Sequence, residues 1–189
     1  VVLCDHFVLL DTERNRELLS AYGQYLKVEG NEVQPRSEFI TLLHGDIREE
    51  AIQKQISQVD IVLSTSVFEH LDDVPGITKA LAKLTASQGI HLHFVDLRDH
   101  FFKYPFEMLK YSESVWKHFL NPTSNLNRYR WNDYKHVFEE NFGQVNFIVI
   151  ERLVEEFSKA KSKIRPEFRT GDENIDAVTL IHVIAKQPK

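Results

Sequence analysis

The sequence predicts an α/β fold built on a mostly parallel sheet. Short apolar runs of strand length alternate along the chain with segments in which apolar residues recur at helical spacing. Because helices separate successive strands, we expect right-handed crossovers between parallel strands. The 189 residues, 42% of them hydrophobic and 27% charged, have an ordinary globular composition and fit one domain over residues 1–189.

The first part of the chain is predicted to contain three strands, over residues 1–4, 39–43 and 60–63. A helix between the first two begins at Asp11 or Thr12 and ends at Gly30. Side-chain oxygens of this kind cap the first amides of a helix, and glycine is common after its end. A loop is expected over residues 34–37, and a short helix over residues 48–57.

A well-marked helix start follows the third strand. Asp72 and Asp73 supply capping oxygens and Pro75 suits the first turn, so a helix is expected from there to Gly89. A fourth strand is expected over residues 90–95.

The chain then changes character. Residues 97–131 are rich in aromatic side chains and irregular, and they are predicted to form an insertion or lid. A helix from Asn132 to Gly143 follows, and the last strands are expected over residues 145–150 and 177–185, on either side of a charged segment. Within one domain, the predicted parts are residues 1–96, 97–131 and 132–189.

Composition excludes several classes of protein. No two of the seven glycines lie within five residues of each other, so neither a GxGxxG nor a GxxxxGK[ST] phosphate loop is present. Cys4 is the only cysteine, which excludes an internal disulfide and favours a reducing, cytoplasmic compartment. The net charge of -5 gives no global attraction to nucleic acid, and no apolar run reaches the roughly 20 residues of a membrane helix. Neither partner is expected.

Two histidines have a spacing that can bind a metal ion. His91 and His93 lie two residues apart on a predicted strand, which places both imidazoles on one face. Sequence spacing supplies no third ligand, so no metal site is predicted.

Polar residues follow the predicted strands, and in parallel sheets ligands bind at these carboxyl ends. Asp5 is placed to accept hydrogen bonds from a ribose diol, or to cap a helix. Asp46 could accept from an exocyclic amine while Ile47 covers a flat base, or Asp46 could cap the following helix. Ser64 and the stretch from Asp96 to Asp99 follow the next two strands.

The segment STSVFEHLDD, from Ser64 to Asp73, resembles the motif that follows a DhV strand in class I S-adenosylmethionine-dependent methyltransferases. The preceding DIV segment (residues 60–62) resembles that family's strand. The GDI segment (residues 45–47) resembles its adenine-binding turn, and Asp5 resembles its ribose-binding acid. The resemblance implies that S-adenosylmethionine is the cofactor. It implies a cofactor site made of Asp5, His6, Gly45, Asp46, Ile47, Ser64, Thr65 and Ser66.

A narrower resemblance covers nearly the whole chain. Several later segments are similar to a bacterial methyltransferase group associated with glycan pathways. They are FVDLRDHF (residues 94–101), YSE (111–113) with Trp116, NRYR (127–130) with Asp133 and Tyr134, and PEFR (166–169). This resemblance implies a Rossmann-like, seven-stranded sheet with helices on both faces and an antiparallel last strand. It places the family's first strand and glycine-rich loop before Val1, so the chain is expected to be N-terminally truncated and inactive on its own.

Methyl transfer from a sulfonium to an oxygen requires in-line positioning and often a general base. His100 and His70 are predicted for that role because an imidazole titrates near neutrality, and Asp99 is placed to orient His100. Either histidine could instead only bond a loop backbone. Arg128, Tyr129 and Arg130 are predicted to line the acceptor pocket, where a guanidinium can pair with phosphate or carboxylate; surface ion pairs are the alternative.

The leading hypothesis is therefore methyl transfer to a small or glycan-linked acceptor, on oxygen. One alternative is a non-catalytic interaction module with a methyltransferase-like fold. A second is a nicotinamide-dependent Rossmann oxidoreductase, against which the Glu69-His70 motif argues.

Overall fold

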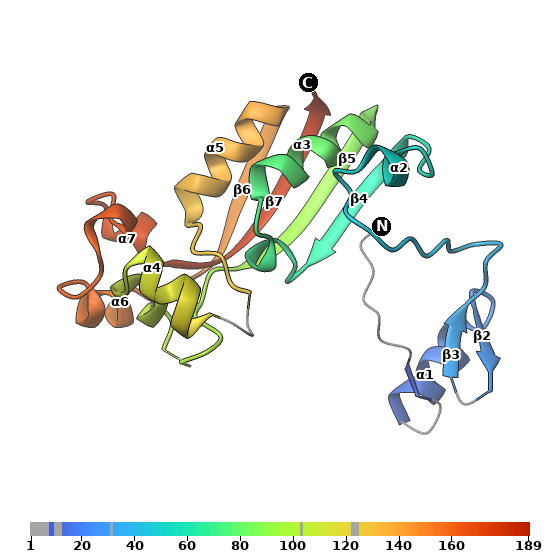
Figure 1. Ribbon diagram of the computed structural model, residues 1–189, viewed down its shortest axis with the longest axis horizontal. Helices are drawn as coiled ribbons and strands as arrows, with labels where there is room; N and C mark the ends of the chain where they lie inside the picture. Colours follow the sequence, from blue (N-terminus) through green and yellow to red (C-terminus); the bar gives the residue numbers. More distant parts are fainter. Residues whose placement is uncertain (1–7, 10–12, 31, 103, 122–124) are drawn as a thin grey trace. The chain divides into compact units, whose positions relative to one another are not determined.

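The structure is a computed structural model that describes residues 8–9, 13–30, 32–102, 104–121 and 125–189 (Figure 1). The chain divides into two compact units, Val1–Lys54 and Gln55–Lys189, and each is described by itself. The predicted strand over residues 1–4 and the predicted helix caps Asp11 and Thr12 lie outside the described residues. A single domain over residues 1–189 stays a prediction.

The first unit contains a small antiparallel sheet with the order β1-β3-β2. Its elements are β1 (Val8–Leu9), α1 (Glu13–Tyr22), β2 (Leu26–Glu29), β3 (Glu32–Pro35) and α2 (Glu50–Gln53). The prediction of a helix reaching Gly30 is wrong, because the chain after Tyr22 pairs as a hairpin, with Gly30 at φ 62° after β2. The predicted strand over residues 39–43 is also wrong: that segment has no regular structure, and the Phe39 side chain is exposed.

The second unit carries the larger sheet. Its strands are β4 (Val59–Thr65), β5 (Thr85–Asp96), β6 (Phe142–Arg152) and β7 (Val178–Pro188). Its longer helices are α3 (Val74–Leu84), α5 (Trp131–Asn141) and α6 (Val154–Ala160). Short helical turns complete it: η1 (Phe68–His70), η2 (Glu107–Lys110), α4 (Glu113–Val115), the π-helical η3 (Trp116–Leu120), η4 (Pro166–Phe168) and α7 (Glu173–Asp176).

This sheet is mixed, with the order β4-β5-β7-β6. Strands β4 and β5 are parallel, whereas β7 runs antiparallel to both β5 and β6. The prediction of a mostly parallel sheet is therefore wrong for these four strands. The reason lies in the connection after β6, which returns the chain to the end of that strand, where Arg152 pairs with Val178. The α/β class and the antiparallel last strand are confirmed.

Helix α3 begins where the sequence predicted. The Asp73 carboxylate accepts from the backbone N–H of Gly76 at 2.9 Å, and Pro75 lies in the first turn. The helix ends at Leu84 and not at Gly89, because the chain from Thr85 onward is extended and belongs to β5. A Cβ at Gly89 would lie 3.1 Å from the carbonyl oxygen of Val59 on β4, so glycine permits the close approach of these strands.

Helices α3 and α5 pack side by side on one face of the larger sheet (Figure 1). Their buried residues, among them Tyr134 and Phe138, join Phe68 of η1 and the inward side chains of β5 and β7 in one hydrophobic core. On the opposite face, Ile61 and Leu63 of β4 are exposed.

A second hydrophobic core organises the predicted insertion. Phe106, Met108 and Trp116 from residues 97–131 pack with Phe157 of α6 and Ile164. This segment is therefore a packed part of the unit with short helical turns, which agrees with its irregular, aromatic sequence.

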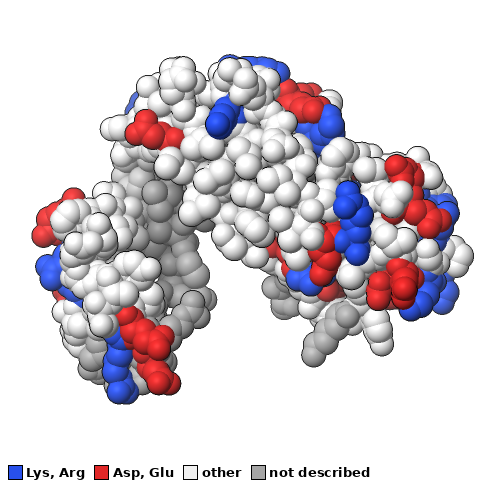
Figure 2. All heavy atoms as spheres, turned by 180° about the vertical axis from the view of Figure 1, so that it is seen from behind, with Lys and Arg blue, Asp and Glu red and all other residues white. Residues whose placement is uncertain are grey.

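The described surface carries charges of both signs. In Figure 2, Lys and Arg side chains lie next to Asp and Glu side chains on the face shown. Among the described helices, none has the length and apolar character that crossing a membrane requires.

Candidate functional site

The end of β4 and the turn after it contain three predicted cofactor residues: Ser64 and Thr65 in the strand, and Ser66 in the turn. Ser66 has φ 52°, a left-handed conformation that is uncommon for a residue other than glycine. Its backbone N–H donates to the carbonyl of Phe94 at 3.0 Å, which joins the turn to β5. Strained backbone of this kind is found preferentially at ligand-binding turns.

The carboxyl ends of the parallel strands β4 and β5 bring the two predicted catalytic histidines together. The ring centroids of His70, in η1 after β4, and His100, after β5, lie 5.5 Å apart. The carboxylate beside His100 is Asp96, whose Oδ2 is 3.4 Å from His100 Nε2. Asp99 does not orient His100 here, because its Oδ1 accepts from the backbone N–H groups of Phe101 and Phe102.

Hydrogen bonds from Arg98 favour the ionised form of the Asp96 carboxyl. Burial raises the pKa of this carboxyl, but hydrogen bonds from Arg98 outweigh burial and hold the pKa below its usual value. Arg98 Nε lies 2.9 Å and Nη2 2.6 Å from the two carboxylate oxygens. The sequence indicates that Asp96 follows a strand, but it gives no signal for a catalytic role of this residue.

Glu69 also belongs to this site, although the sequence indicated it only as part of the Glu69-His70 motif. Its side chain is 2% exposed, and among the described residues neither carboxylate oxygen has a hydrogen-bond partner. Burial raises its pKa. Asn127 fixes the surrounding turn, since its backbone N–H donates to the Glu69 carbonyl and its side-chain amide to the carbonyls of Phe68 and Leu71.

Beneath this edge, β5 carries a buried hydrogen-bonded histidine pair. His91 Nδ1 lies 3.1 Å from His93 Nε2, and His93 Nδ1 lies 2.8 Å from Ser64 Oγ. Burial lowers the pKa of His91 to about 4 and that of His93 to about 3. Across the part of the chain that is described, no group of three or more acidic, histidine or cysteine side chains is arranged to hold a metal ion.

The remaining predicted cofactor residues belong to the first unit. Asp5 and His6 lie outside the described residues. Gly45 has φ 142°, and a Cβ there would lie 2.6 Å from the Ile52 side chain, so glycine is required. Hydrogen bonds from the side chain and backbone of Arg48 lower the pKa of Asp46 to about 2. Ile47 is buried.

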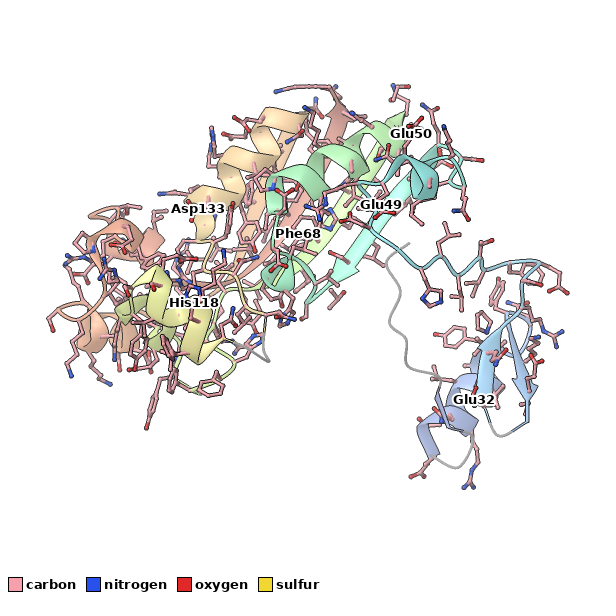
Figure 3. All side chains as sticks on the ribbon, in the orientation of Figure 1. Glu32, Glu49, Glu50, Phe68, His118 and Asp133 are labelled. Atoms are coloured by element: carbon pink, nitrogen blue, oxygen red, sulfur yellow. The ribbon has the colours of Figure 1, made fainter. Side chains whose placement is uncertain are left out.

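Two of the three predicted acceptor residues, Arg128 and Tyr129, line a cavity of about 990 Å³. Other lining residues come from α3, α4, η3 and α5, and Asp133 marks the start of α5 in Figure 3. The Arg128 guanidinium donates to the carbonyls of Met108 and Tyr111 and pairs with Glu113, while its buried Nε–H has no partner among the described residues.

Arg130 is not among the residues that line this cavity. Its buried guanidinium donates to the carbonyls of Leu97 at 2.6 Å, Val178 at 2.7 Å and Asp176 at 3.4 Å. It therefore joins the end of β5 to the start of β7. A single sequence offered no signal that separates this role from ligand binding, because both need a guanidinium.

No protein-family model matches the sequence, and no curated protein matches it. Among solved structures, a chain from the Haloferax volcanii complex of the Trm112 methyltransferase activator with a methyltransferase is similar over 78% of this chain, with 16% identity and a TM-score of 0.42. Phosphoethanolamine N-methyltransferase 2 of Haemonchus contortus, solved with phosphomonomethylethanolamine and S-adenosylhomocysteine, is similar over 69% of this chain, with 12% identity and a TM-score of 0.37. The chain spans 61% of the first solved chain and 34% of the second.

Proposed function

We propose that this protein is an S-adenosylmethionine-dependent methyltransferase that acts on an oxygen of a small or glycan-linked acceptor. The observation that carries the proposal is the edge formed by the carboxyl ends of β4 and β5. There the turn with Ser66 in a left-handed conformation lies on the same two parallel strands as the His70–His100 pair with Asp96. Ligands of α/β proteins bind at this edge.

The residues at the end of β4 and in the turn after it fit the cofactor. Ser64, Thr65 and Ser66 offer hydroxyl groups there, and the backbone conformation of Ser66 is itself unusual. In the first unit, the residues that carry the resemblance, Asp5, His6, Gly45, Asp46 and Ile47, are proposed to hold the adenosine part, with Asp46 exchanging its bonds to Arg48 for an adenine amine. When bound, the cofactor supplies a methyl group on a positively charged sulfur.

Proton removal from the acceptor is assigned to His100. With Nε2–H directed at Asp96, the Nδ1 lone pair is free to accept a proton from an acceptor hydroxyl. The ionised Asp96 carboxylate stabilises the imidazolium that results, because opposite charges at this distance favour the charged form. Glu69 and His70 lie next to each other in η1, and the His70 ring lies beside the His100 ring.

The cavity next to Tyr129 is proposed to bind the acceptor. Its volume of about 990 Å³ suits a small molecule, and its lining combines the aromatic side chains of Trp116 and Phe168 with charged groups. Arg128, which lines this cavity, is proposed to pair with a phosphate or carboxylate group of the acceptor.

A thermal-shift comparison of two ligands separates this function from the oxidoreductase alternative. The experiment uses the full-length protein. We expect millimolar S-adenosylhomocysteine to raise Tm and NADH to leave it unchanged, since ligand binding to the folded state alone stabilises it. A shift with NADH and none with S-adenosylhomocysteine would favour the oxidoreductase, and no shift with either would favour the interaction module.

A further inference from the structure

A continuous chain of hydrogen bonds runs through the buried face of β4 and β5 to the predicted cofactor turn. Ser64 Oγ is 2.8 Å from His93 Nδ1, His93 Nε2 is 3.1 Å from His91 Nδ1, and His91 Nε2 is 2.7 Å from Thr85 Oγ1. Thr85 Oγ1 is also 2.7 Å from the carbonyl oxygen of Leu81 at the end of α3. All four side chains from Ser64 to Thr85 therefore belong to one series.

The Leu81 carbonyl sets the direction of every bond in this series. A carbonyl oxygen can only accept, so the single Thr85 hydroxyl hydrogen points to Leu81 and Thr85 Oγ1 accepts from His91 Nε2–H. A neutral imidazole has one N–H, so His91 Nδ1 accepts from His93 Nε2–H. His93 Nδ1 then accepts from the Ser64 hydroxyl.

The side chains around His91 and His93 stabilise these hydrogen-bond directions. Both imidazoles have no exposed surface and are neutral at physiological pH, because burial disfavours their charged form. The His93 ring packs against Phe68 at 4.5 Å and Phe138 at 5.4 Å, and the His91 ring packs against Phe142 at 4.5 Å between centroids. Aromatic side chains offer the ring nitrogens no alternative partners, and Figure 3 shows Phe68 at the turn between β4 and α3.

We propose that this series fixes Ser64 as a hydrogen-bond acceptor toward the cofactor, and that Thr85, His91 and His93 are positioning residues that act through Ser64. The inference rests on the proposed function, because that function assigns Ser64 to the cofactor site. With its hydrogen committed to His93, the partly exposed Ser64 presents only oxygen lone pairs outward. The ligand group that it selects is therefore a donor, an N–H or O–H of the cofactor.

Nitrogen NMR of the histidine side chains in the complete gene product tests the direction itself. We expect His91 and His93 to be Nε2–H tautomers. In Thr85→Val, His91 Nε2–H loses its acceptor, so the series is expected to reverse to Nδ1–H tautomers and leave the Ser64 hydroxyl free to donate outward. Thr85→Ser keeps the hydroxyl and should keep the original tautomers. If Thr85→Val does not fold, the tautomers of the unmodified protein still test the direction of the series.

Thr78→Val is the matched control. Thr78 is buried in α3 and donates to the Val74 carbonyl at 2.7 Å, the same four-residue contact that Thr85 makes, but it has no hydrogen bond to either histidine of the series. A structural role alone would lower stability equally in both valine variants and change neither tautomer.

Calorimetric titration with S-adenosylhomocysteine is the second arm. We expect Thr85→Val to weaken binding about fivefold, as loss of one directed hydrogen bond does, with Thr85→Ser and Thr78→Val near the unmodified protein. Nδ1–H tautomers in the unmodified protein would overturn the inference, as would unchanged affinity in a folded Thr85→Val. Absence of binding by the unmodified protein would instead overturn the proposed function, and with it the role of Ser64 toward a cofactor, while the tautomers would still report the direction of the series.

Discussion

Replacing Arg130 with methionine is expected to lower the free energy of unfolding by about 3 kcal/mol. The carbonyl groups that accept hydrogen bonds from Arg130 are buried, so water cannot replace the guanidinium. The guanidinium holds Leu97 at the end of β5 and Asp176 and Val178 at the start of β7. Burial lowers the pKa of Arg130 to about 10, so the side chain stays charged at neutral pH and makes charge-assisted bonds.

Urea unfolding followed by circular dichroism measures this loss, and Arg152→Met is its control. Arg152 Nε also donates to a carbonyl, that of Asn174 at 3.1 Å, but at an exposed position. We expect the control to change stability by no more than about 0.5 kcal/mol. Equal losses in the two variants would show that Arg130 does not have the role assigned to it.

Stability is expected to fall steeply as the pH drops below about 6.5, the ordinary pKa of histidine. The folded protein keeps His91 neutral down to about pH 4 and His93 down to about pH 3, whereas the unfolded chain protonates both near pH 6.5. Between these limits the unfolded state binds up to two more protons, so acid favours unfolding. Each proton contributes at most about 1.4 kcal/mol per pH unit, and above pH 6.5 this dependence vanishes.

Urea midpoints at pH 7, 6 and 5 test this expectation. Carboxylates with lowered pKa values, such as Asp46 and Asp96, lose their stabilising charge below pH 4 and do not account for a change at higher pH. Glu69, whose pKa is raised, acts in the opposite direction. The exposed His136→Gln should leave the slope unchanged, and a midpoint that is constant from pH 7 to 5 would contradict the buried, neutral histidine pair.

Local signals in the sequence predicted individual elements better than their arrangement. Asp73 and Pro75 marked the start of α3, because a capping carboxylate and a first-turn proline act within one turn of helix. The ends of α3 and α5 were predicted at the nearest glycines and were wrong by a few residues, since β5 begins at Thr85 and β6 at Phe142. Strand pairing across the sheet decides these ends, and that pairing is not visible in local spacing.

The same limit applies to the site. The Glu69-His70 motif and the strand end before His100 pointed to both histidines as site candidates. The structure brings their rings together, because the carboxyl ends of adjacent parallel strands share one edge. The sequence predicted Asp99 as the partner of His100, but the path of one loop places Asp96 there. The buried roles of Arg130 and of the His91–His93 pair depended on contacts with β7 and with β4, which a single sequence does not show.

Calorimetric titration of the complete gene product with S-adenosylhomocysteine tests the central claim most directly. We expect saturable binding, and we expect Asp5→Ala, which removes the acid assigned to the ribose, to weaken it about tenfold, or about 1.4 kcal/mol. Unchanged affinity in Asp5→Ala would show that the ribose acid lies elsewhere. No detectable binding at millimolar ligand would contradict the assignment of this protein as a methyltransferase.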